Sequence, residues 1–83
     1  MIFPTVHLNG TGRQALLDQL CEASAAINDA LKALSNAMPN GRDYYTQPGN
    51  AISTAIVEHS ARVAALVKVR DELMEIAEHI IDA

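Results

Sequence analysis

The chain has 83 residues, a net charge of −4 at pH 7 and an apolar fraction of 49%. This length allows one small domain, and such an apolar fraction excludes a disordered tail. The acidic balance argues against broad nucleic-acid binding, because that binding depends on cations that neutralise phosphates. Only Phe3, Tyr44 and Tyr45 are aromatic, so the apolar side chains are mainly the small and aliphatic ones found in seams between helices.

Residues 1–10 are predicted to form an extended arm, because apolar and polar residues alternate loosely and an Asn-Gly turn signal ends the segment. Thr11 and Gln14 then have the spacing of a capping box, which predicts the start of a helix. We expect this first helix over residues 11–38, where a stripe of residues recurs in steps of three and four. The stripe consists of Leu17, Leu20, Ser24, Ile27, Leu31, Leu34 and Met38.

Residues 39–50 are predicted to form the loop at the tip of a hairpin. Pro39 ends the first helix, and Asn50 is placed to cap the next one. The loop concentrates side chains that are common at binding hot spots, and these are Arg42, Asp43, Tyr44 and Tyr45. Two interpretations stay open: the tyrosines bind a protein partner, or they fold back and close the end of a helical bundle.

A second helix is predicted over residues 51–82. Its stripe consists of Ile52, Ile56, His59, Val63, Leu66, Val69, Leu73, Ile76 and Ile80. Further apolar residues beside this stripe widen it to nearly half of the circumference, and a helix with a single neighbour needs a narrower face. We therefore predict an all-α fold, a long antiparallel two-helix hairpin within one domain over residues 1–83, which dimerises into a four-helix bundle.

His59 and Arg70 are the polar residues expected at the helical interface. Polar groups in such seams set the register, so we expect His59 to be hydrogen-bonded there and Arg70 to reach an acidic side chain across the interface. The rival interpretation is a small dimeric enzyme or anion-binding protein in which His59, Arg62 and Arg70 line a pocket between subunits. Within one helix His59 and Arg70 are about 16 Å apart along the axis, so only a partner helix would bring them together.

No motif in the chain indicates a cofactor, a metal or a catalytic residue. Glu75 and His79 lack the Glu-x-x-His spacing of helical-bundle metal sites, because Ile76 stands three residues before His79. Cys21 is the single cysteine and has no neighbour that would activate it, so we expect a packing role. One cysteine also excludes an intramolecular disulfide, and we expect a cytoplasmic protein that neither spans a membrane nor carries a secretion signal.

Residues 7–11 (HLNGT) and 40–45 (NGRDYY), together with Glu58 and His59, resemble small helical-hairpin proteins found in phages and in prophage regions of proteobacteria. The resemblance covers most of the chain. It implies a phage-type accessory protein and carries over no activity and no site residue. Together with the helical pattern, it favours a non-enzymatic, homo-oligomeric interaction or structural module that contacts an unidentified protein partner, and neither nucleic acid nor a membrane.

Overall fold

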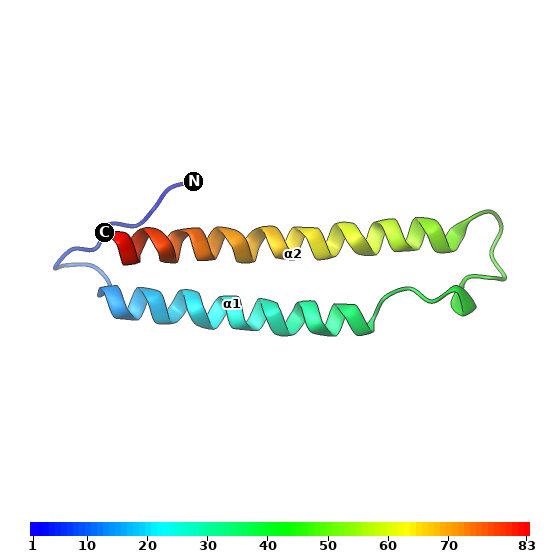
Figure 1. The fold of residues 1–83 in the computed structure, drawn as a ribbon, viewed down its shortest axis with the longest axis horizontal. Helices are drawn as coiled ribbons and strands as arrows, with labels where there is room; N and C mark the ends of the chain where they lie inside the picture. The colour runs from blue at the N-terminus through cyan, green and yellow to red at the C-terminus, as the bar shows by residue number, and fades with distance from the viewer.

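The computed structural model describes residues 1–83 and contains two long helices with no strand (Figure 1). Helix α1 spans Arg13–Asn36, the short 3-10 helix η1 spans Gly41–Asp43, and α2 spans Ala51–Asp82. The two long helices lie side by side and antiparallel, and the molecule measures 61 × 21 × 18 Å. The predicted all-α hairpin is therefore confirmed. We call the loop end of the hairpin the tip and the opposite end the base.

Helix α1 is shorter at both ends than the predicted span of residues 11–38. The capping box is wrong, because Gly12 takes the N-cap position and has no side chain to bond the first turn. Gln14 instead donates a hydrogen bond from Nε2 to Asp18 Oδ1 at 2.8 Å. At the other end the Ala37 N–H bonds two carbonyls of the last turn, and Met38 lies beyond the helix.

The loop at the tip is ordered by its own side chains. Asn40 Oδ1 accepts hydrogen bonds from the backbone N–H of Arg42 at 3.0 Å and from Arg42 Nε at 3.4 Å, which starts the single turn of η1. Gly49 has φ +71°, a conformation that suits glycine and redirects the chain into α2. Asn50 takes the N-cap position of α2 as expected, but its side chain makes no capping hydrogen bond.

The seam between the helices follows a seven-residue repeat on α2. Every member of this repeat is buried or half-buried: Ile52, His59, Leu66, Leu73 and Ile80. On α1 the predicted stripe from Leu17 to Leu34 is half-buried and faces the seam. Val69, predicted for the α2 stripe, is instead exposed, because the heptad repeat turns it away from α1. Ile56 is also exposed, because α1 ends at Asn36 before it reaches this part of α2.

The base of the hairpin is closed by contacts from the first residue of α1 and from the N-terminal arm. Arg13 donates hydrogen bonds from Nη2 to the carbonyl of Ile80 at 2.6 Å and to the carbonyl of Ile81. The Phe3 ring stacks on His79 with a centroid distance of 4.4 Å, so the arm lies along the end of α2 (Figure 1). A cation at the C-terminus of α2 satisfies orphan carbonyls and opposes the helix dipole.

Candidate functional site

Most of the apolar surface of the hairpin remains exposed. Only Ile80 and His59 are buried among the 83 residues. Large apolar side chains elsewhere along the hairpin reach solvent, and these include Met38, Ile56, Val57, Val69, Met74 and Ile81. Folded monomers seldom expose extended apolar patches unless the patch binds something. The exposed apolar surface is therefore the feature of this chain that most needs a functional explanation.

Two hollows lie between the helices, one in each half of the hairpin. The hollow nearer the tip has a volume of about 400 Å³ and is lined chiefly by Leu31, Met38, His59, Val63 and Val67. The hollow nearer the base has a volume of about 360 Å³ and is lined chiefly by Leu20, Cys21, Met74, Ala77 and Ile81. Both are open to solvent, and apolar side chains dominate their walls.

The two hollows belong to one face of the hairpin. On α2 the lining residues Val67 and Met74 are seven residues apart, which is two helical turns, so their side chains point in nearly the same direction. On α1 the lining residues Asn28 and Leu31 are three apart and also share a face. We call this continuous face, with its two hollows, the groove.

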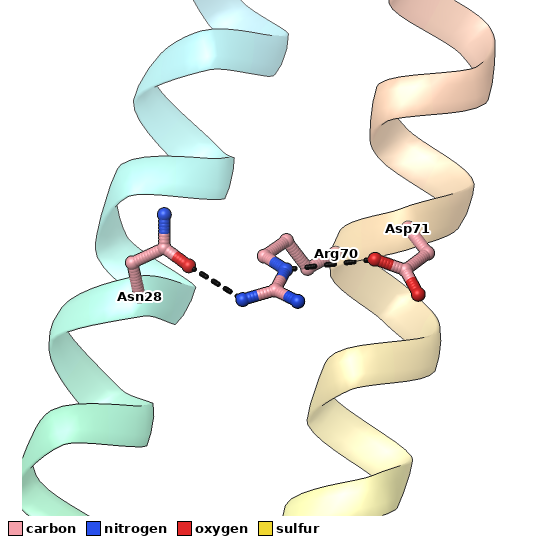
Figure 2. A network of polar contacts seen from close by, with 3 residues as sticks. All are labelled: Asn28, Arg70 and Asp71. Atoms are coloured by element: carbon pink, nitrogen blue, oxygen red, sulfur yellow. Dashed lines mark hydrogen bonds and ion pairs between the residues drawn. The ribbon is translucent and has the colours of Figure 1, made fainter.

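A polar contact joins the helices midway along the groove (Figure 2). Arg70 Nη1 on α2 donates a hydrogen bond to Asn28 Oδ1 on α1 at 3.0 Å, and Arg70 Nε lies 3.6 Å from Asp71 Oδ1. The Arg70 side chain is 30% exposed and that of Asp71 63%. The sequence predicted an acidic partner for Arg70 across the seam. In the hairpin the partner across the seam is instead the amide of Asn28, and the neighbouring carboxylate, Asp71, is on the same helix as Arg70.

His59 lies where the sequence predicted, in the seam, and it also lines the tip hollow. The residue is only 7% exposed, yet its ring makes no hydrogen bond within the chain. The expected hydrogen bond of His59 is absent within the single hairpin, and a hydrogen bond across a dimer interface stays a prediction. Neither ring nitrogen is completely buried without a hydrogen-bond partner, so both keep some contact with solvent.

The three residues of the rival enzyme site do not meet within one chain. His59 faces the tip hollow, and Arg70 lies midway along the groove. Arg62 instead lines a separate hollow of about 390 Å³ beside the loop, together with Tyr44 and Glu58. A single hairpin thus has no pocket that combines this histidine with both arginines.

The four residues of the tip are split between packing and exposure. Tyr44 is half-buried against the start of α2, whereas Tyr45 is 81% exposed. Arg42 and Asp43 are also exposed, and Arg42 is held by Asn40. Tyr44 is thus partly packed at the end of the helices and Tyr45 is exposed, and binding of a partner by the tip stays a prediction.

Metal-ligand side chains do not cluster anywhere in the structure. No group of three or more His, Cys, Asp or Glu residues is arranged to hold a metal ion. His79 is stacked on Phe3, and Cys21 is a free, exposed thiol on the wall of the base hollow. Neither helix has an apolar stretch of sufficient length and hydropathy to cross a membrane.

The groove was not predicted from the sequence, although the excess of exposed apolar surface was. Val67 and Met74 are among the apolar residues that widen the predicted stripe of the second helix, whereas Asn28 was outside the predicted stripe of the first. Their three- and four-residue spacing is visible in the sequence, but it becomes a shared face only when the register of α1 against α2 is known. Searches of protein-family models, curated proteins and solved structures found no match to this chain. The resemblance to phage-type hairpins therefore stays a prediction.

Proposed function

We propose that this protein is a non-enzymatic, homo-oligomeric helical hairpin that serves as an interaction or structural module in the cytoplasm. The observation that carries the proposal is the burial: two residues of 83 are buried, while an apolar groove runs along the hairpin. A second hairpin laid on that groove would convert two helices into a four-helix bundle.

The physical argument rests on the small size of the single seam. Ordering a helical residue costs roughly 1–2 kcal/mol of backbone entropy, and burial of apolar surface returns about 25 cal/mol per Å². A hairpin whose only fully buried large side chain is Ile80 gains little from burial. Association through the groove adds apolar burial without ordering any further segment, because the helices are already formed. Stability and assembly are therefore linked in this proposal.

The exposed tip supplies the second part of the proposed role. Tyr45 and Arg42 are exposed in the tip loop and line neither hollow of the groove, so a dimer formed through the groove would keep them accessible. Aromatic and arginine side chains are the residues most enriched at binding hot spots. We infer that the tip contacts a protein partner, in keeping with the accessory role that the resemblance to phage-type hairpins implies.

The test of the proposal is the mass of the protein in solution. Light scattering coupled to size-exclusion chromatography at micromolar concentration should give at least twice the chain mass of 8.9 kDa. Circular dichroism on the same sample should show helix and a cooperative thermal transition. A well-folded monomer under these conditions would remove the argument for self-association.

A further inference from the structure

We propose that a second copy of this chain docks on the groove in the antiparallel sense, so that the tip of each hairpin lies over the base of the other. The inference rests on the proposed self-association and adds its surface and its geometry. Two observations carry it: the charge is divided unequally between the two ends of the hairpin, and the groove has similar apolar hollows on either side of a polar centre.

The charge of the hairpin is polarised along its length. The tip half, residues 30–70, contains five Lys or Arg and two Asp or Glu, a net charge of +3. The rest of the chain, which forms the base half, contains one Arg and eight Asp or Glu, a net charge of −7. The boundary between the halves lies at the contact of Arg70 with Asn28, midway along the groove (Figure 2).

This polarity favours one of the two ways in which hairpins can pair face to face. In a parallel pair the two bases lie together, and a charge of −7 faces a charge of −7. In an antiparallel pair each base faces a tip of charge +3. Neighbouring helices in a bundle pack about 8–10 Å apart, which is within the Debye length of about 10 Å at 0.1 M salt. The charges therefore interact across the interface at ordinary ionic strength.

The apolar surface of the groove is compatible with the same arrangement. Val67 stands three residues before Arg70 and Met74 four residues after it, each on the wall of a hollow. A two-fold axis at Arg70 exchanges these positions, so Met74 of each copy meets the tip hollow of the other. The hollows have similar volumes, about 400 and 360 Å³, as an exchange of the two halves requires.

The polar residues of the groove acquire partners in this arrangement. Asp71 is 63% exposed beside Arg70, so it is available to the Arg70 guanidinium of the second copy at the two-fold axis. The last turns of α2 carry Glu78 and Asp82, and those turns come to lie over the tip hollow of the other copy. His59 opens into that hollow without a hydrogen bond of its own, and these carboxylates bring acceptors to it.

The occupant is a second copy because the surface is complementary to itself. An unrelated acidic helix would match the tip half and be repelled by the base half, and an unrelated basic helix would show the reverse. A copy of this chain, reversed, matches both halves at once. Such an isologous contact closes with two subunits and leaves no unsatisfied groove.

The test is a distance between the two tips of the dimer. A spin label is attached to Tyr45→Cys in a Cys21→Ala background, and double electron–electron resonance is measured on a sample whose dimeric mass is first established by light scattering. The antiparallel dimer predicts a tip-to-tip distance above about 55 Å, because each tip lies beyond Ala51, which is about 28 Å along α2 from the two-fold axis at Arg70. A parallel dimer predicts a distance below about 30 Å, since its tips lie on neighbouring helices.

The two measurements separate the two proposals. A dimer with a short tip-to-tip distance overturns the antiparallel arrangement and leaves the self-association intact. A monomeric mass overturns both. The same sample can carry Glu75→Lys, which makes the base less acidic. The antiparallel dimer predicts that this change weakens association by about 3- to 10-fold, through the loss of attraction in two symmetric contacts. A stronger dimer would overturn the arrangement, because only the parallel pair gains from a less acidic base.

Discussion

Arg70 occupies a position that an apolar residue would fill in an ordinary helical seam. It stands four residues after Leu66 and three before Leu73, both of which face α1. The half-buried guanidinium is held by one amide, Asn28, and by the carboxylate of Asp71. Polar groups at such positions commonly fix register and oligomeric state at a cost in stability. We therefore assign specificity, and not stability, to Arg70.

Replacement of Arg70 by Leu should separate these two effects. The substitution removes a partly buried charge and adds apolar packing, so we expect the free energy of unfolding to stay the same or to rise by about 1 kcal/mol. The loss of the polar centre should broaden the distribution of oligomeric states in sedimentation velocity experiments. A variant that is less stable and still a uniform dimer would contradict this role.

The two tyrosines of the tip should respond differently to truncation. Tyr44 is half-buried, so Tyr44→Ala should lower the free energy of unfolding by about 1–2 kcal/mol, less than the roughly 3–5 kcal/mol lost with a fully buried aromatic ring. Tyr45→Ala should change stability by less than about 0.5 kcal/mol, because the ring is exposed. Chemical denaturation of the two single variants measures both values. Equal and large losses would remove the tip from the candidate binding surfaces.

At the scale of the elements, the sequence predicted the two helices and their antiparallel pairing, because three- and four-residue spacing and the Pro and Gly positions are local signals. The ends of α1 were less predictable. Gly12 took the N-cap position that Thr11 was expected to fill, and a capping box is one of several ways to start a helix.

The face of α2 that contacts α1 was the main error at this scale. Val69 was assigned to the apolar stripe because it stands three residues after Leu66 and four before Leu73. The pair of helices instead follows a seven-residue repeat, which brings Arg70 toward the seam and leaves Val69 outside. Apolar width in a sequence thus indicates how many neighbours a helix needs, and the packing decides which residues face each of them.

The contact of Arg13 with the end of α2 gives a prediction about local stability. Arg13→Ala removes donors to the carbonyls of Ile80 and Ile81 and a cation at the helix C-terminus, so we expect a loss of about 1 kcal/mol. Hydrogen exchange should speed up in the last turns of α2 and remain unchanged near residues 51–60. Arg42→Ala, which removes a cation from the far end of the hairpin, is the matched control. Uniform acceleration along α2 would show that the contact is not a local cap.

At the scale of the whole molecule, the charge polarity predicts how salt acts on the assembly. An antiparallel dimer gains from attraction between unlike halves, and salt screens that attraction. The dissociation constant of the dimer should therefore rise between 0.05 and 0.5 M sodium chloride, as measured by sedimentation equilibrium. Tighter association at high salt would indicate that like halves face each other.

The groove could not have been located from composition or spacing alone, since it exists only where both helices contribute to one face. Val67 and Met74 on α2 become neighbours of Leu31 and Cys21 on α1 through the register of the hairpin. The width of the stripes predicted the excess of exposed apolar surface. It did not predict on which side of the hairpin the two helices combine this surface into one face.

The most direct measurement compares the light-scattering masses of two variants that each place an aspartate at an exposed apolar position of α2. Met74 is 50% exposed in the groove, and Val69 is 45% exposed and lines neither hollow of the groove. Self-association through the groove predicts that Met74→Asp shifts the protein to a monomer of 8.9 kDa, because the dimer would bury an unpaired charge, while Val69→Asp keeps at least twice that mass. Equal masses for the two variants would contradict the account.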